Sequence, residues 1–195
     1  MELQRVRAIG RSLLTAVLLL GAAASWAGGW RACKPPGAGF AVSMPGDVVH
    51  ATVDAQTPFG AVRLYTWEAS AGDLAFTALY SDYPAAVVKR NKADNILIHA
   101  SDSIVAVTEG TLTVNRWLKV SGYLAREIEV VSAKTKATIR CRWVLAGTRL
   151  YQAMAARPRA TEGAADVDRF FASFRLTSPA KPPSRPTRAT GRRSG

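Results

Sequence analysis

Short stretches in which apolar and polar residues alternate restrict the fold of this chain more than any other feature of its sequence. Strand side chains point alternately to the two faces, so an apolar residue at every second position predicts a strand with a buried face. Turn sequences such as Pro45-Gly46, Ala71-Gly72-Asp73 and Ser121-Gly122 separate these stretches. We expect strands at residues 40–44, 48–57, 61–68, 74–81, 111–120, 123–131, 137–145 and 150–155.

Two other segments have the periodicity of amphipathic helices. Apolar residues spaced three or four apart fall on one helix face within residues 93–107 and again from Val167 to Phe174. Strands joined by short turns run antiparallel, and amphipathic helices bury their apolar faces on a sheet. The expected fold is therefore α+β, with a single antiparallel sheet of about six to eight strands flanked by two amphipathic helices.

The N-terminal segment has the three parts of a secretory signal peptide. Arg5, Arg7 and Arg11 precede the apolar residues 13–24, and small residues follow at Ser25 and Ala27. We predict a signal peptide over residues 1–27, so the chain is exported to the periplasm or secreted. The alternative is an uncleaved membrane anchor, because residues 12–30 carry no charge.

The C-terminal segment 177–195 is rich in proline and contains no acidic residue. We expect a disordered tail there, a folded domain over residues 37–176 and a linker over residues 28–36. The chain has 26 Lys and Arg against 14 Asp and Glu, a net charge of +12. Five of its basic residues lie in the tail: Lys181, Arg185, Arg188, Arg192 and Arg193.

Several short sequence motifs lie in residues 37–176. They are Gly39-Phe40-Ala41-Val42 with Met44-Pro45-Gly46, Tyr80-Ser81-Asp82-Tyr83-Pro84, Gly122-Tyr123, Arg126-Glu127-Ile128-Glu129, Gly147 with Arg149-Leu150-Tyr151-Gln152, and Asp168-Arg169-Phe170-Phe171-Ala172-Ser173-Phe174. With the order of the expected elements, these motifs resemble the PsbP-like fold, which also occurs in secreted bacterial domains of unknown function. The resemblance implies an antiparallel sheet flanked by helices and a binding, assembly or accessory role, and it carries no catalytic residue.

Residue patterns that carry catalysis or bind metals are missing from the sequence. The two histidines, His50 and His99, belong to no HExxH or HxH motif, which argues against a transition-metal site. There is no GxSxG or SxxK nucleophile motif and no phosphate-binding glycine loop. We therefore expect no catalytic residue, no metal and no cofactor.

The two cysteines, Cys33 and Cys141, are the candidate disulfide of an exported chain. The alternative is a buried free thiol at Cys141 and a loose one at Cys33.

Tyr80, Asp82 and Tyr83 are candidates for the rim of a ligand groove between the sheet and the first helix. The alternative is ordinary turn chemistry before Pro84. Arg126, Glu127 and Glu129 are expected to form cross-strand pairs on an exposed face.

These features together predict an exported, non-catalytic binding or accessory domain of the bacterial cell envelope. Its partner would be an envelope protein or a small ligand. Nucleic acid is excluded by export, and an integral membrane protein results only if the signal stays uncleaved. The alternatives are adhesion of the basic tail to an anionic surface and an enzyme with a dispersed site.

Deletion of residues 177–195 tests the adhesion alternative. Clustered cations near an anionic surface contribute roughly 1 kcal/mol each, so the truncated protein should detach from anionic envelope fractions at low salt. Sedimentation with envelopes measures this, and unchanged association would exclude the tail as the adhesive element.

Overall fold

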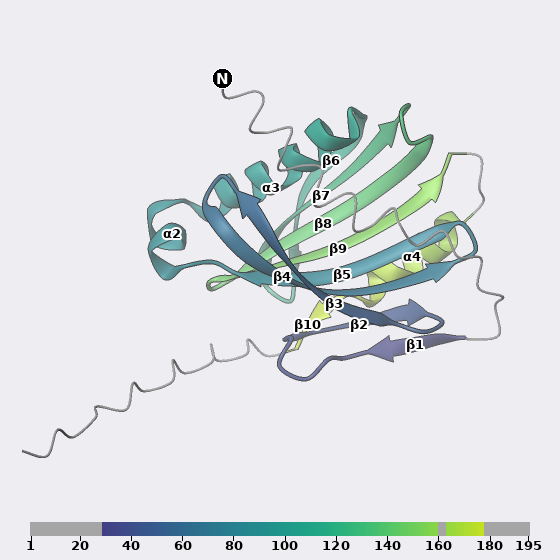
Figure 1. The fold of residues 1–195 in the computed structure, drawn as a ribbon, viewed down its shortest axis with the longest axis horizontal. Helices are drawn as coiled ribbons and strands as arrows, with labels where there is room; N and C mark the ends of the chain where they lie inside the picture. Colours follow the sequence, from purple (N-terminus) through teal and green to yellow (C-terminus); the bar gives the residue numbers. More distant parts are fainter. Residues whose placement is uncertain (1–28, 160–162, 178–195) are drawn as a thin grey trace, which may run out of the picture.

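The computed structural model describes residues 29–159 and 163–177, so the expected signal peptide and residues 178–195 of the expected tail lie outside the described residues. This part of the chain forms two sheets and three helices, and Figure 1 shows how they are arranged. The strands are β1 (Trp30–Cys33), β2 (Phe40–Pro45), β3 (Val49–Thr57), β4 (Gly60–Ala71), β5 (Leu74–Asp82), β6 (Thr111–Val120), β7 (Tyr123–Ser132), β8 (Ala137–Ala146), β9 (Arg149–Pro158) and β10 (Arg175–Leu176). The helices are α2 (Ala85–Arg90), α3 (Ala93–Thr108) and α4 (Ala164–Ser173).

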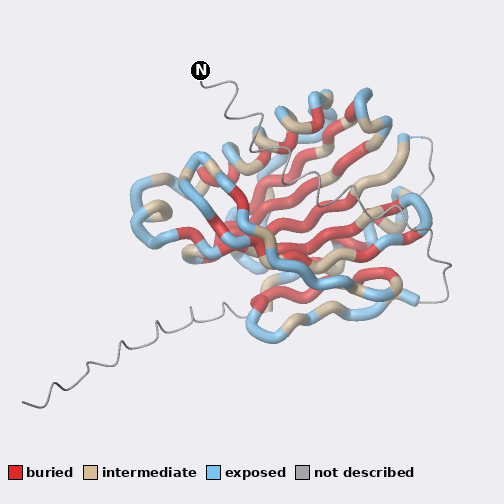
Figure 2. The backbone as a smooth tube through the Cα atoms, viewed as in Figure 1, coloured by how far each residue is buried: buried red, intermediate tan, exposed pale blue. Residues whose placement is uncertain are grey.

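The large sheet has seven antiparallel strands in the order β3-β4-β5-β9-β8-β7-β6. Strand β9 joins the two halves of the chain, because it pairs with β5 on one side and with β8 on the other. Almost every residue of β8 and β9 is buried, whereas β3 and β6 at the edges are largely exposed (Figure 2). The central strands are therefore covered on both faces.

Helix α3 covers one face of this sheet and contacts β7 and β8. Ile96, Leu97 and Ile104 point from the helix into a core that includes Ile128 and Trp143. The helix ends at Thr108, and the chain then passes through Gly110, where an added Cβ would lie 2.2 Å from the Val130 side chain. Glycine is required there because the chain turns directly against β7.

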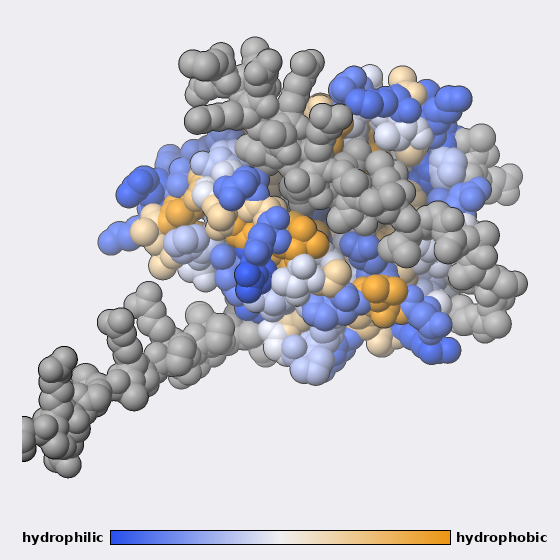
Figure 3. Space-filling view, in the orientation of Figure 1, coloured by the Kyte–Doolittle hydropathy of each residue, from blue (hydrophilic) through white to orange (hydrophobic). Residues whose placement is uncertain are grey.

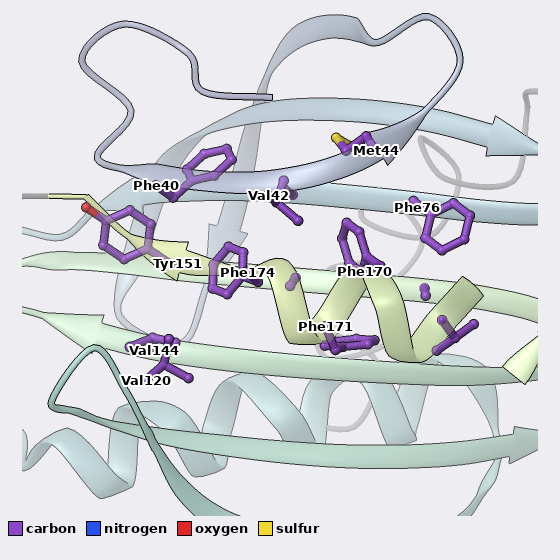
Figure 4. Close-up of a cluster of buried hydrophobic side chains, with 14 of the residues drawn as sticks. Phe40, Val42, Met44, Phe76, Val120, Val144, Tyr151, Phe170, Phe171 and Phe174 are labelled. Carbon is purple, nitrogen blue, oxygen red and sulfur yellow. The ribbon is translucent and has the colours of Figure 1, made fainter. Parts of the chain in front are cut away.

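The opposite face is covered by α4 and by β2, which contact each other. Figure 4 shows the aromatic side chains of α4 meeting those of β2 and β5 in a second core. This core contains Phe40, Val42, Met44, Phe76, Tyr151, Phe170, Phe171 and Phe174. This apolar packing holds α4 against β2 and against the sheet.

The structure differs from the expected single sheet because the first predicted strand, β2, leaves the large sheet. β2 pairs with β1 and β10 in a separate three-stranded sheet and buries both its faces. Strand β1 occupies part of the segment expected to be a linker, residues 28–36. The meander predicted from β2 to β5 is therefore β3-β4-β5 alone.

A charged cluster on the α4 side of the sheet centres on Glu127, which is 1% exposed. Arg116 and Arg140 donate to its Oε1 at 3.0 and 2.9 Å, and Arg142 donates to its Oε2 at 2.7 Å. Arg142 also donates to the Phe171 carbonyl at 2.7 Å, and this ties the cluster to α4. Glu127 forms the expected cross-strand pairs, with Arg116 on β6 and Arg142 on β8. The exposed face expected for these pairs is wrong, because α4 closes over this part of the sheet.

Two opposing effects act on the pKa of Glu127. Burial raises it, but attraction and hydrogen bonding by Arg142, together with Arg140 and Arg116, outweigh burial and lower the pKa below its usual value. The folded state therefore gains stability from the ionised carboxylate above the ordinary glutamate pKa. This gain is lost as the pH falls through the lower folded-state pKa.

Replacement of Glu127 by Gln should lower the free energy of unfolding by about 3 kcal/mol at pH 7, because three guanidinium groups lose their buried counter-ion. The loss should shrink as the pH falls below about 4.3, where the glutamate of the unfolded wild-type chain begins to bind a proton, and further as the pH falls through the lower folded-state pKa. Urea unfolding at pH 7 and pH 3 measures it.

Glu129→Gln is the matched control for this substitution, since Glu129 lies on the same strand and face but is only half-buried. Its change should stay below about 1 kcal/mol. Equal losses at both glutamates would contradict the central role of Glu127.

Candidate functional site

A pocket lies between the α3 side of the sheet and the turn that connects β3 to β4, and we call it the α3 pocket. Its floor is formed by β4, β5, β8 and β9, its roof by α3, and its wall by the turn. The floor residues are Leu64, Leu79, Ser81, Trp143, Leu150 and Gln152. The roof residues are Ile96, His99, Ala100, Ser103 and Ile104, and the wall includes Ala55 to Phe59 and Tyr83.

The lining of the α3 pocket carries no Asp, Glu, Lys or Arg side chain. The volume that the centre of a water molecule can occupy is about 70 Å³. The whole empty space of the pocket, including its open mouth, is about 640 Å³. Pockets for small ligands are mostly apolar, with a few polar groups that fix orientation. The α3 pocket has this character, and its enclosed part suits one end of a small molecule.

Two polar side chains lie in the otherwise apolar floor, Ser81 at 2% exposure and Gln152 at 8%. The Ser81 hydroxyl makes no hydrogen bond with another described residue. Gln152 has one weak contact, from its amide Nε2 to the Met154 sulfur at 4.0 Å. Both groups therefore have their hydrogen-bonding capacity directed to the pocket rather than to the protein.

Aromatic rings close the mouth of the α3 pocket. Phe59 stands edge-on to Tyr83, with ring centroids 6.0 Å apart, and to His99, at 5.4 Å. Burial raises the pKa of the Tyr83 hydroxyl, against a smaller opposing effect of its hydrogen bond with Thr57. Tyr83 thus stays protonated and uncharged at neutral pH, and the mouth remains uncharged on this side.

Of the three residues expected to form a groove rim, Tyr83 lines the pocket and the other two lie on the opposite face of the sheet. Arg149 donates to both oxygens of Asp82 at 2.7 Å, and its guanidinium lies 3.9 Å from the centre of the Tyr80 ring. It also donates to the Gly37 carbonyl at 2.9 Å. Tyr80 and Asp82 therefore help to hold the chain before β2 against β5 and β9.

The sequence patterns alone do not predict Ser81 and Gln152 as pocket residues. Strand alternation could have found Ser81, because it lies between Tyr80 and Asp82 and must point to the other face. Gln152 is an isolated polar residue within the apolar run of β9, and this isolation is the one sequence feature that indicates a special role for it.

The expected disulfide is absent, because Cys33 and Cys141 are both free. Cys141 is buried in the core beneath α3, whereas Cys33 packs against the core on the other side of the sheet. The large sheet separates the two sulfurs, so the bond could not form without rebuilding the fold. Burial raises the pKa of both thiols and suppresses their reactivity.

The histidines are far apart in the fold. His50 stacks on Trp67 with ring centroids 4.6 Å apart, and its Nδ1 lies 2.8 Å from the Thr66 carbonyl oxygen. His99 lies at the mouth of the α3 pocket. Among the residues described, no group of three or more His, Cys, Asp and Glu side chains is placed to hold a metal ion.

Figure 3 shows hydrophilic and hydrophobic residues interspersed over the visible described surface. In residues 29–159 and 163–177, no helix is long and apolar enough to span a membrane.

The fold matches a solved structure of cyanobacterial PsbP from Synechocystis sp. PCC 6803, with a TM-score of 0.52 and 11% sequence identity. The match covers 82% of this chain and 98% of that protein. The chain therefore has a PsbP-like fold, as its sequence phrases implied. No protein-family model matches the chain, and no curated protein matches it in sequence.

Two other solved structures match less well. A protein from Bacteroides thetaiotaomicron VPI-5482 has a TM-score of 0.45 and 12% identity, over 78% of this chain and 50% of that protein. A protein of unknown function from Pseudomonas aeruginosa has a TM-score of 0.36 and 13% identity, over 68% of this chain and 85% of that protein.

Thiol labelling tests the placement of the cysteines. In the unfolded, unreduced protein we expect two labels per chain, since neither thiol is bonded. In the folded protein Cys141 should stay unlabelled, and Cys33 should account for any slow reaction. Mass spectrometry counts the labels, and Cys33→Ser should leave one label after unfolding. An unfolded chain that takes up no label until it is reduced would mean that the two sulfurs are bonded.

Proposed function

We propose that this PsbP-like domain is an exported, non-catalytic binding module that holds an uncharged, largely apolar ligand in the α3 pocket. The observation that carries the proposal is the pocket itself: an apolar space lined by four strands of the sheet and roofed by α3. Export is supported by the charge and hydropathy pattern of residues 1–27.

A binding role fits the pocket better than a catalytic one. General acid–base or nucleophilic catalysis needs a base within hydrogen-bonding reach of the group that it activates. The Ser103 hydroxyl on the roof donates to the His99 backbone carbonyl at 2.8 Å, and the His99 ring rests against Phe59. Ser81 lies in the floor among apolar residues, with no carboxylate or cation in the pocket lining to activate it.

Native isolation of the protein from its host tests export and binding together. Mass spectrometry should find a mature chain that begins after Ala27 or Ala24, and native spectra should show a co-purifying small molecule. Recovery of the full-length, ligand-free chain from the cytoplasm would contradict the proposal.

Filling the pocket tests whether it is the binding site. Ala100 lines the roof, so Ala100→Phe should place a ring in the pocket and abolish binding of toluene, an uncharged apolar probe. The measurement is a toluene titration followed by amide chemical shifts in NMR spectra, in which residues such as Leu79 and Leu150 should respond.

Ala106→Phe is the matched control, since Ala106 is an exposed residue of the same helix. This variant should bind toluene as the wild type does. If toluene leaves the wild-type pocket resonances unchanged, the α3 pocket is not a binding site.

A further inference from the structure

The polar groups in the floor of the α3 pocket are placed as a pair. In the register of β5 and β9, Gln152 lies opposite Leu79, and Ser81 lies opposite Leu150. The two side chains are therefore diagonal neighbours on one face of the sheet, with Cβ atoms about 7 Å apart. One small polar group placed between them could contact both.

The polar atoms of Ser81 and Gln152 that lack protein partners are open to the pocket, because Thr135 Oγ1 is the one fully buried side-chain polar atom without a hydrogen-bond partner among the described residues. Buried polar groups in native proteins nearly always have hydrogen-bond partners, and an unsatisfied one costs roughly 1–3 kcal/mol. Among the described residues, Gln152 has only its weak contact with the Met154 sulfur, and the Ser81 hydroxyl has no hydrogen-bond partner. Water can occupy the site in the free protein, but the apolar lining offers such water few further partners.

The chemistry of the lining restricts the head group of a ligand. A charged head between Ser81 and Gln152 would be buried without a counter-ion, since the pocket lining has no Asp, Glu, Lys or Arg side chain, and this is strongly unfavourable. A glutamine side chain both donates and accepts, and a serine hydroxyl can do either. A neutral carboxamide matches both properties, because it carries a donor and an acceptor on adjacent atoms.

The remainder of the pocket fits a compact apolar body. Leu64, Leu79 and Trp143 lie in the floor next to the polar pair, and Ile96 and Ile104 face them from the roof. The enclosed space of about 70 Å³ suits a ring or a short alkyl group, with any further part of the ligand at the mouth near Phe59.

We propose that the α3 pocket is specific for small uncharged amides, with the amide bound between Ser81 and Gln152 and its apolar body against Trp143. This specificity rests on the proposed binding function. The proposed specificity adds the chemical class of the ligand and the two residues that bind its head group.

Three probes with the same ring separate this specificity from simple apolar binding: benzamide, benzoate and toluene. Benzamide should bind about tenfold more tightly than toluene, as expected for one net hydrogen-bonded group. Benzoate should bind at least tenfold more weakly than benzamide, because it brings an uncompensated charge. NMR titration of the full chain gives the three dissociation constants.

Variants assign the preference to the polar pair. Gln152→Leu should remove most of the preference for benzamide and leave toluene binding unchanged or stronger. Ser81→Ala is a second, smaller change that should lower benzamide affinity severalfold. Asn95→Leu is the matched control, since Asn95 is an exposed amide side chain of α3 outside the pocket lining, and it should keep the wild-type preference.

Each result decides between two conclusions. Benzamide preference that is lost in Gln152→Leu and kept in Asn95→Leu supports the assignment. Equal affinity for benzamide and toluene overturns the amide specificity but leaves the binding function intact. A benzamide preference that persists in both Gln152→Leu and Ser81→Ala likewise overturns the assignment to these two residues and leaves the binding function intact. Absence of binding by all three probes overturns both proposals.

Discussion

The central strands of the large sheet carry apolar side chains on both faces, so both faces must be covered. Helix α3 covers β7 and β8 on one side, and α4 with β2 covers the other. The α3 pocket is a consequence of how α3 covers its side of the sheet. Because α3 lies mainly over β7 and β8, its cover over β4 and β5 is incomplete, and the β3–β4 turn fills the remaining gap only in part.

The same requirement explains which parts of the fold could be predicted from the sequence. Alternation and helical periodicity identified the strands of the large sheet, α3 and α4, because these signals are local. The strand that β2 pairs with is not determined by local sequence, because an alternating strand can pair at any sheet edge. Packing in the second core, together with α4, places β2 outside the large sheet. Likewise, Glu127 looked exposed in sequence because nothing local shows that α4 closes over it.

The candidate site was predictable to a similar degree. Tyr83 was expected beside a groove between the sheet and the helix, and it lines the α3 pocket. Tyr80 and Asp82 were grouped with it by closeness in sequence, although strand alternation sends them to the other face, where Arg149 binds Asp82. The suggested pairing of Cys33 with Cys141 failed for a related reason, because composition cannot tell on which side of a sheet each sulfur lies.

The small sheet has a mechanical consequence. Strand β2 lies between β1 and β10, and the first residue of β1 pairs near Pro45 whereas the last residue of β10 pairs with Phe40. The chain thus enters and leaves this sheet at opposite ends of β2. A pulling force applied between residues 29 and 177 acts along the strands, so the hydrogen bonds of the β1–β2 ladder bear it together and not one after another. This arrangement makes the small sheet, which holds both ends of the described domain, a clamp against extension.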